Sequence, residues 1–249
     1  MDPTIRSNRR AWDTAARTYV EEHDVWLAVA ADGSSLLDVE RELLRDVLAA
    51  APDVVHLQSG NGTDDVALAN AGARSVVGVD FSEVTTRAAQ RRADELGAPC
   101  RYVVGVLPGA PLAGGSADLV YTGKGALIWL PDLDAWAADV ARLLRPGGHL
   151  FLYEEHPAFA LWTWDPDEPR IRPDRDYFAA SHVNDDFPAN GAVQRQHTLG
   201  EIVTAVATAG LRILHLEEYA EPFWRMGGVT AASWNGRLPN SFSLLAVAR

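Results

Sequence analysis

Apolar positions in the first fifty residues recur at the three-to-four-residue intervals of helices. One such helix is predicted over residues 4–20. A second apolar series, over residues 36–48, predicts another helix, with Ser34 or Ser35 as its N-terminal cap. The apolar positions of the first helix are Ile5, Trp12, Ala16 and Tyr19. We therefore expect residues 1–50 to form a helical lid at the start of a single domain that covers residues 1–249.

From residue 53 onward, short apolar runs alternate with helical stretches. Strands are expected over residues 54–57, 75–79, 100–105, 118–122, 149–154, 211–216 and 242–247. Helices are expected over residues 64–71, 82–96, 133–144 and 198–209. Strands that are buried on both faces and joined by crossover helices are typical of a doubly wound, mostly parallel sheet. The pattern thus predicts an α/β fold.

Residues 157–188 interrupt this alternation. Five of the fourteen prolines fall here, together with the charged run DPDEPRIRPDRD, so no long helix or strand is expected. Long loops in compact domains are commonly functional lids, and aromatic side chains favour a packed lid over a disordered one. We predict that residues 157–196 cap a substrate site, which suits a flat or apolar molecule. The aromatic candidates for binding it are Trp162, Trp164, Tyr177 and, from a later loop, Trp224. Packing of these rings onto the domain is the alternative interpretation.

Composition excludes several classes of partner. A net charge of −12 disfavours a nucleic-acid surface, which needs clustered Lys and Arg. The single cysteine, Cys100, excludes an internal disulfide, and we expect it to be a buried apolar residue. No window has the length and apolarity of a membrane span, and the N-terminal residues lack the apolar core of a signal peptide. No zinc or calcium spacing is present. We therefore expect a cytoplasmic, metal-independent protein with a small-molecule substrate, and leave homodimer formation open.

The segment VVHLQSGNGTD predicts a ligand site. Gly60 and Gly62 follow a strand and precede a helix, so a ligand can approach the bare backbone near unpaired N–H groups. Asp80 lies 18 residues after Gly62, where the next strand ends. A carboxylate there can accept hydrogen bonds from both hydroxyls of a ribose. The combination predicts a nucleoside.

Single positions disfavour other glycine-rich motifs. A dinucleotide-binding turn would have a third glycine where Asp65 stands, and Asp65 would face the pyrophosphate. A phosphate-binding loop would need glycine at Asp118, and a nucleophile elbow would need glycine at Leu57. An NAD(P)-dependent oxidoreductase is consequently a less favoured hypothesis.

The segments VVHLQSGNGTDDVALANAGA, VVGVDFSE, ADLVYTGKGALIWLPDLDAWAADVARLLRPGGHLFLYEEHP and HTLGEIVTAVATAGLRI together resemble class I S-adenosylmethionine-dependent methyltransferases. The resemblance is to the small-molecule branch of bacterial secondary metabolism and covers about residues 8–249. It implies a Rossmann-like sheet of seven strands, with six parallel and the last antiparallel. It also implies S-adenosylmethionine as cofactor and methyl transfer to oxygen or nitrogen of a small aromatic or apolar metabolite. Carbon methylation, or cofactor binding without catalysis, are the alternatives.

The resemblance also implies cofactor contacts. Gly60 and Gly62 would line the methionine moiety, Asp80 would bind the ribose, Phe81 would lie against adenine, and Tyr19 would close over the cofactor. The whole set is Tyr19, Gln58, Ser59, Gly60, Asn61, Gly62, Asp80, Phe81, Gly105, Val106, Leu107, Thr122 and Gly123. Two positions depart from the family pattern. His56 replaces a carboxylate that commonly steadies the ammonium end of the cofactor, and Val106 replaces an aspartate that accepts a bond from adenine.

Histidine is the expected general base for a hydroxyl or ammonium acceptor. Methyl transfer from a sulfonium otherwise requires mainly alignment and a dry site. His156 is the first candidate because it follows a strand at the ligand-binding edge of the sheet, and His197 is the second. Glu155 is the third, since successive strand residues face opposite sides and either it or Glu154 should face the site. Lys124 is expected to be an ordinary exposed lysine.

Overall fold

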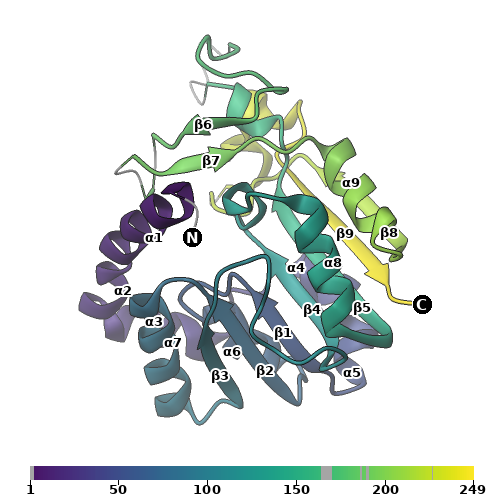
Figure 1. Ribbon diagram of the computed structural model, residues 1–249. Coiled ribbons are helices and arrows are strands. Elements are labelled where there is room, and N and C mark those ends of the chain that lie inside the picture. The colour runs from purple at the N-terminus through teal and green to yellow at the C-terminus, as the bar shows by residue number, and fades with distance from the viewer. Residues whose placement is uncertain (1–2, 164–169, 186, 189–190, 226) are drawn as a thin grey trace.

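A seven-stranded sheet forms the centre of the computed structural model, which describes residues 3–163, 170–185, 187–188, 191–225 and 227–249 (Figure 1). The strands are β1 Asp53–Leu57, β2 Ser75–Asp80, β3 Cys100–Val104, β4 Ala117–Gly123, β5 Leu144–Glu155, β8 Arg212–Tyr219 and β9 Ser241–Val247. They lie in the order β3-β2-β1-β4-β5-β9-β8. The four pairings among β1 to β5 are all parallel, and β9 is antiparallel to both β5 and β8. The predicted sheet of six parallel strands and one antiparallel last strand is confirmed.

Helices cover both faces of this sheet. They are α1 Pro3–Ala15, α2 Arg17–Glu21, α3 His23–Asp32, α4 Asp38–Leu43, α5 Arg45–Ala49, α6 Thr63–Asn70, α7 Glu83–Leu96, α8 Leu133–Leu143 and α9 Leu199–Thr208. Val55 and Leu57 pack toward α8 and α9, whereas Val54 packs toward α3, α5, α6 and α7, because successive side chains of a strand face opposite sides. None of the described helices is long and apolar enough to cross a bilayer.

The N-terminal segment differs from the two helices expected there. It forms five shorter helices, α1 to α5, which end at turns such as that of Gly33, whose φ is +69°. Neither Ser34 nor Ser35 caps the helix that follows. The N-cap position is Leu37, and the carboxylate of Glu40 accepts a hydrogen bond from the Leu37 N–H at 2.8 Å. The Glu40 carboxylate, in the first turn of α4, therefore bonds the backbone N–H of Leu37 and takes the capping role that was expected of a serine.

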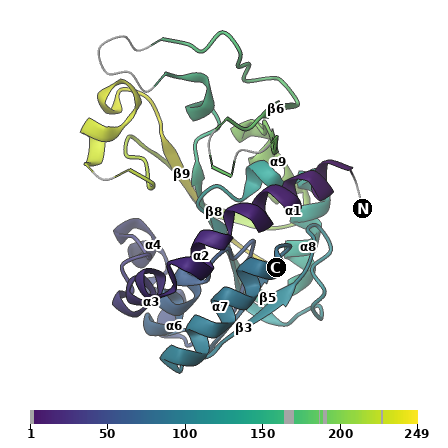
Figure 2. The same cartoon turned by 90° about the vertical axis from the view of Figure 1, so that its left-hand side faces the viewer.

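The described residues of the insertion at 157–196 lie beyond the carboxyl edge of the parallel strands, beside α1 (Figures 1 and 2). They contain a short 3₁₀ turn, Phe159–Leu161, and a hairpin of β6 Ser181–Val183 and β7 Val193–Arg195. The side chain of Asn8 joins α1 to this hairpin: its Nδ2 donates to the Val193 carbonyl at 2.9 Å and its Oδ1 accepts from the Val193 N–H at 2.8 Å. The N-terminal helix and the insertion thus meet across the edge of the sheet.

Gly62, which precedes α6, is required by packing. Its φ is +80°, and a Cβ on it would overlap the hydroxyl of Tyr102 and lie 2.8 Å from the Cβ of Ala89. Gly97 at the end of α7 has a similar φ of +63°, but a Cβ there would meet no atom within 4 Å. Gly97 is therefore favoured by its backbone conformation alone, whereas Gly62 is favoured by its conformation and also by the lack of space for a Cβ.

We expect Gly62→Ala to destabilise the protein far more than Gly97→Ala. The left-handed conformation costs an alanine about 1–2 kcal/mol at either site, and overlap at residue 62 adds about 1–3 kcal/mol. Urea unfolding monitored by tryptophan fluorescence measures both variants. Equal loss of stability in the two would contradict the steric role of Gly62.

Candidate functional site

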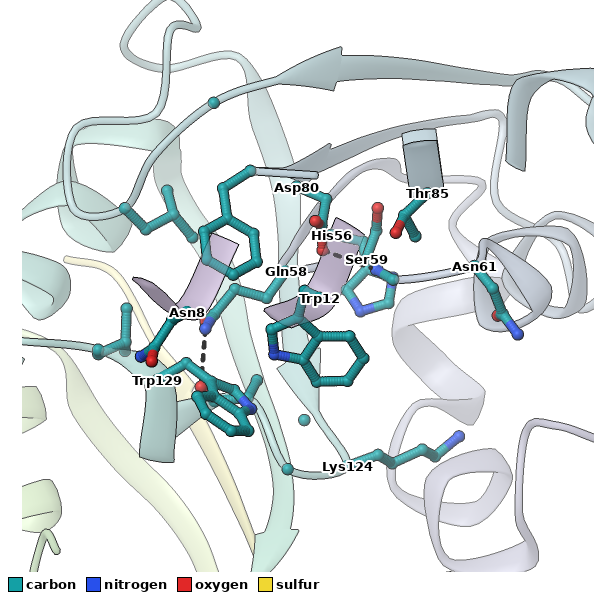
Figure 3. A pocket seen from close by; sticks show the side chains of 18 of the residues that line it. Asn8, Trp12, His56, Gln58, Ser59, Asn61, Asp80, Thr85, Lys124 and Trp129 are labelled. Atoms are coloured by element: carbon teal, nitrogen blue, oxygen red, sulfur yellow. Dashed lines mark hydrogen bonds between the residues drawn. The ribbon is translucent and has the colours of Figure 1, made fainter. Parts of the chain in front are cut away.

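A cavity of about 210 Å³ opens at the carboxyl ends of β1, β2 and β4 (Figure 3). Eleven of the thirteen cofactor-binding residues expected from the sequence line it. They are Tyr19, Gln58, Ser59, Gly60, Asn61, Asp80, Phe81, Gly105, Val106, Leu107 and Gly123. They come from five separate segments: Tyr19 belongs to α2, and the other four segments lie at strand ends, because parallel strands deliver their last residues to one edge of the sheet. The fold therefore gathers most of the expected site in one place.

Asp80 is held in position by two backbone donors. Its Oδ2 accepts from the Gly60 N–H at 3.1 Å, and its Oδ1 accepts from the Ser82 N–H at 2.8 Å. Burial raises the pKa of Asp80 to about 6, although both backbone bonds act to lower it. Each carboxylate oxygen can still accept another hydrogen bond. Asp80 is thus a rigid acceptor in the cavity wall.

The turn between β1 and α6 exposes its backbone to the cavity. Gly60 has a φ of +55°, and the space where its Cβ would lie is empty. Gln58 also has a positive φ, +59°, and its Nε2 donates to the Ala126 carbonyl at 2.7 Å. That bond ties the turn to the loop after β4. A ligand can therefore approach the backbone at Gly60 within a rigid frame.

Two expected cofactor residues do not line this cavity. Gly62 lies beneath the turn, against Tyr102 and Ala89, as its packing requires. Thr122 is fully buried within the sheet, where its Oγ1 donates to the Leu57 carbonyl at 3.1 Å. Both residues face the protein interior. The order of residues in the sequence does not reveal this.

His56 and Asp65 form a buried pair behind the turn. The Nδ1 of His56 lies 2.6 Å from the Oδ1 of Asp65, and the Asp65 side chain is completely inaccessible to solvent. Asp65 therefore does not line the cavity. The helix that carries Asp65 turns it inward, under the strand end, and His56 itself lines the cavity.

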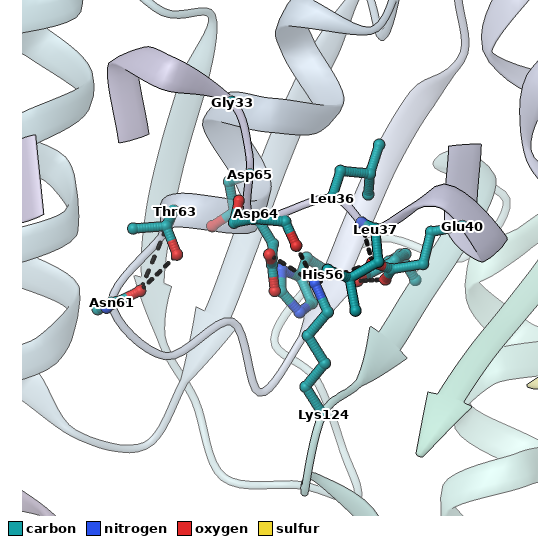
Figure 4. Close-up of polar contacts among 12 residues, drawn as sticks. Gly33, Leu36, Leu37, Glu40, His56, Asn61, Thr63, Asp64, Asp65 and Lys124 are labelled. Atoms are coloured by element: carbon teal, nitrogen blue, oxygen red, sulfur yellow. Dashed lines mark hydrogen bonds and ion pairs between the residues drawn. The ribbon is translucent and has the colours of Figure 1, made fainter. Parts of the chain in front are cut away.

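Lys124 is not an ordinary exposed lysine. Its Nζ donates to the Ser35 carbonyl at 2.6 Å and to the carboxylates of Asp64 at 2.8 Å and Glu40 at 3.0 Å (Figure 4). Burial acts to lower the pKa of Lys124, but these two carboxylates outweigh it and raise the pKa. The hydroxyl of Tyr121 also donates to Glu40, whose pKa is raised by burial. One ammonium group thus joins the α4 region, α6 and the loop after β4.

The three expected catalytic residues lie beside a second, smaller cavity instead of the main one. His156, His197 and Glu155 all line that cavity. The Nδ1 of His156 accepts from the Ala158 N–H at 3.1 Å, and its Nε2 lies 2.8 Å from Glu218. The Nε2 of His197 donates to the Leu130 carbonyl at 3.0 Å. Both rings thus bind groups of the protein, and neither lines the main cavity.

Glu154, and not Glu155, faces the loop that borders the main cavity. Its carboxylate accepts from the N–H groups of Gly125 and Ala126 at 2.8 Å and of Leu127 at 2.9 Å. Burial raises the pKa of Glu154 to about 7 against these bonds. Successive residues of β5 face opposite sides, as expected. Glu154 is the one that holds the loop after β4 in position.

The aromatic residues expected to bind the substrate lie away from the main cavity. Trp162 packs against Trp234 with ring centres 5.4 Å apart, and Trp224 packs against Phe159 at 4.5 Å. The hydroxyl of Tyr177 accepts from the Leu199 N–H at 3.2 Å. None of Trp162, Tyr177 and Trp224 lines the main cavity, and Trp164 lies outside the described residues. These rings pack the insertion and the late loops onto the domain.

Trp12 and Trp129 supply the aromatic wall of the main cavity. Trp12 comes from α1 and Trp129 from the 3₁₀ turn Leu127–Trp129, and their ring centres lie 5.7 Å apart, edge to face. Ile5 and Leu130 add apolar surface beside them. The sequence contained a signal for Trp129 as a cavity residue. It lies shortly after a parallel strand, and ligands of open α/β sheets bind beyond such strand ends.

Residues 54–148 match the family model described as a methyltransferase domain. Nocamycin O-methyltransferase of Saccharothrix syringae is 33% identical over 150 residues, which are 57% of this chain and 52% of that protein. The match thus spans about half the length of this relative.

Solved structures share the fold of this chain. An S-adenosylmethionine-dependent methyltransferase from Mesorhizobium loti matches with a TM-score of 0.66 and 24% identity, covering 87% of this chain and 99% of that one. Geranyl diphosphate C-methyltransferase from Streptomyces coelicolor A3(2) matches with a TM-score of 0.61 and 21% identity, covering 85% of this chain and 78% of that one. That structure contains S-adenosyl-L-homocysteine. The resemblance found in the sequence is confirmed.

The residues of the main cavity fit S-adenosylmethionine, the cofactor predicted from the sequence and supported by these matches. Asp80 offers a carboxylate at one end of the glycine turn, and Phe81, Val106 and Leu107 offer apolar surface next to it. Two buried atoms of cavity-lining residues, Gln58 Oε1 and Ser59 Oγ, have no hydrogen-bond partner among the described residues. Acceptors and apolar surface are thus both present for a nucleoside.

We expect Lys124→Met to destabilise the fold by about 3–5 kcal/mol, because it leaves buried carboxylates without a cation. Thermal or urea unfolding measures the loss. Arg87→Met is the matched control, since the Arg87–Glu83 pair is solvent-exposed and its removal should change stability little. Similar stability of the two variants would show that the Lys124 pairs contribute no more than a surface pair.

Proposed function

We propose that this protein transfers a methyl group from S-adenosylmethionine to an oxygen atom of a small aromatic or otherwise apolar molecule. The observation that carries the proposal is the main cavity, which joins a glycine turn and Asp80 to an aromatic wall. The name of the Saccharothrix syringae relative supports oxygen as the acceptor atom. A cytosolic location and self-association stay predictions of the sequence.

The cofactor half of the cavity is assigned to the residues around the turn. Asp80 would accept the ribose hydroxyls, Phe81 and Leu107 would contact the adenine, and Gly60 would admit the chain that leads to the sulfonium. Tyr19 lies close enough for the charge of Asp80 to raise its pKa, after the larger effect of burial. It would therefore close over the nucleoside from the N-terminal helices.

The acceptor half is assigned to the opposite wall. Its described residues are Ile5, Asn8, Trp12, Trp129 and Leu130. None of these five has a side chain that titrates near neutral pH, and both ends of the Asn8 amide are bound to Val193. This wall can align and desolvate an acceptor but offers no general base. It favours an acceptor that supplies its own oxyanion, such as a carboxylic acid, an enol or an acidic phenol.

S-adenosylmethionine, when bound, supplies a methyl group already activated by its sulfonium. Transfer breaks the sulfur–methyl bond, forms the oxygen–methyl bond and leaves a neutral thioether. For an oxyanion acceptor no proton needs to move, so the protein contributes mainly alignment and exclusion of water. Trp12 and Trp129 are the residues suited to both tasks, because their rings enclose the acceptor side.

Carbon methylation is the second candidate. It is favoured by the shared fold with geranyl diphosphate C-methyltransferase, which acts at carbon according to its name. The same acceptor wall would suit an apolar carbon nucleophile. Position-specific analysis of the methylated product by NMR distinguishes the two candidates.

Replacement of Asp80 by Asn should weaken binding of S-adenosylhomocysteine roughly 5- to 150-fold, because the ribose hydroxyls lose a charged acceptor. In the unchanged protein, affinity should decrease as the pH falls through about 6, where Asp80 becomes protonated. Isothermal titration calorimetry across this range measures both effects. Asp134→Asn, on an exposed position of α8, is the control. Undiminished affinity in the Asp80 variant would remove the ribose assignment.

Replacement of Trp129 by Ala should raise the KM for the acceptor about tenfold or more while leaving cofactor affinity within about twofold, because the lost ring contacts only the acceptor half. The acceptor is found by incubating the protein with methyl-labelled S-adenosylmethionine and panels of phenols, enols, carboxylic acids and amines. Trp224→Ala, outside the cavity, is the matched control. Cofactor binding without labelled product from any class would favour the non-catalytic alternative.

A further inference from the structure

Arg92 is a buried arginine of α7. It is among the largest side chains that solvent does not reach, with 1% of its surface exposed. Among the residues that the structure describes, no carboxylate pairs with its guanidinium group, and its Nε has no hydrogen-bond partner. Burial lowers the pKa of Arg92, and Tyr102 and Tyr19 act against this effect, but a guanidinium group stays charged in proteins. The protein thus keeps an unpaired cation inside, which is unfavourable unless other polar groups compensate it.

Two backbone carbonyls compensate the charge of Arg92. Its Nη1 donates to the Tyr19 carbonyl at 3.0 Å, and its Nη2 donates to the Asn61 carbonyl at 2.6 Å. Because the donors of a guanidinium group are fixed in one plane, the two carbonyls are held relative to each other as well as to α7. Tyr19 and Asn61 stand 73 and 31 positions before Arg92 in the chain. Arg92 therefore joins two segments that are far apart in the sequence.

Both of these segments line the main cavity. Asn61 belongs to the glycine turn between β1 and α6, and Tyr19 belongs to α2. Under the proposed function, the nucleoside of the cofactor would be enclosed between the turn and Tyr19. The distance between the turn and α2 therefore sets the width of the space that the nucleoside would occupy.

The helix α2 has few other contacts that could hold it in place. It is five residues long, none of its residues is buried, and it lies against α7 (Figure 2). So short a helix is unstable by itself, and a segment with few buried contacts opens locally at a low cost in free energy. Within the described parts of the chain, Arg92 is the only side chain that forms a hydrogen bond to the backbone of α2. The position of α2 therefore depends strongly on this bond.

We propose that Arg92 is a positioning residue that holds α2 against the glycine turn and thereby keeps Tyr19 over the nucleoside of the cofactor. This inference rests on the proposed function and adds to it a residue outside the cavity. Arg92 does not line the cavity, so it acts through Tyr19 and Asn61. When the bond to α2 is weakened, this helix opens more often and the cofactor dissociates faster.

Amide hydrogen exchange tests the contact in the absence of any ligand. Arg92→Lys replaces the planar guanidinium by a single ammonium group, which cannot hold both carbonyls in the same arrangement. We expect the amides of residues 17–22 to exchange roughly tenfold faster in this variant, while those of β4 are unchanged. Arg41→Lys is the matched control, because Arg41 also donates to two backbone carbonyls, those of Gly33 and Leu36, outside the cavity. Unchanged exchange of residues 17–22 in Arg92→Lys would overturn the proposal.

The dissociation rate of S-adenosylhomocysteine tests the consequence for the cofactor. Stopped-flow displacement should show this rate to be roughly tenfold higher in Arg92→Lys than in the unchanged protein. The rate for 5′-methylthioadenosine should rise by a similar factor, because this ligand contains the same nucleoside. Urea unfolding of each variant separates this effect from a general loss of stability, which would leave the dissociation rate of the folded protein unchanged. An unchanged rate in folded Arg92→Lys would refute the positioning role.

A double-mutant cycle with Tyr19→Ala decides whether Arg92 acts through Tyr19. Tyr19→Ala removes the ring but keeps the backbone carbonyl, so it should accelerate dissociation by itself, and it keeps the test informative if Arg92→Lys does not fold. In the Tyr19→Ala protein, Arg92→Lys should change the dissociation rate by less than about twofold. An equal effect of Arg92→Lys with and without the Tyr19 ring, or an unchanged rate in Tyr19→Ala, would contradict the proposal. Failure of the unchanged protein to bind either nucleoside would instead contradict the proposed function, and hydrogen exchange would still decide whether Arg92 holds α2.

Discussion

The ammonium group of Lys124 is the contact on which the geometry of the site depends. It joins a backbone carbonyl at Ser35, the carboxylate of Glu40 and the carboxylate of Asp64, which belong to the N-terminal helices and to α6. Lys124 itself follows β4 with a φ of +58°. Buried ions of one sign are strongly unfavourable, so these segments are stable together only around their common cation. The contact places the helical N-terminus over one end of the sheet.

The loop after β4 is oriented by two further contacts from neighbouring strands. Glu154 at the end of β5 accepts three of its N–H groups, and Gln58 after β1 donates to its Ala126 carbonyl. The same loop carries Trp129 into the cavity. The walls of the cavity are therefore joined through backbone atoms of one short segment.

The insertion contributes to the site mainly through what it holds. Asn8 joins it to α1, and Trp12 of that helix packs against Phe187 of the insertion, with ring centres 5.3 Å apart. Its own expected binding residues, Trp162 and Tyr177, pack elsewhere. The insertion thus holds α1 in place, and α1 forms one wall of the cavity. Phe187 of the insertion contributes to the site through this contact with Trp12.

The sequence by itself determined the order of the elements, the glycine turn and Asp80 at the end of β2. These features depend on local periodicity, backbone conformation and the position of a residue at a strand end, which near neighbours in the chain specify. The tertiary structure alone decided that His156 binds Glu218, that Glu154 rather than Glu155 holds the loop, and that Lys124 pairs with Glu40 and Asp64. It also decided that Trp12 and Trp129 form the aromatic wall. Each of these outcomes depends on partners far apart in the chain, such as Glu40 and Lys124, and only the packing of helices on the sheet brings them together.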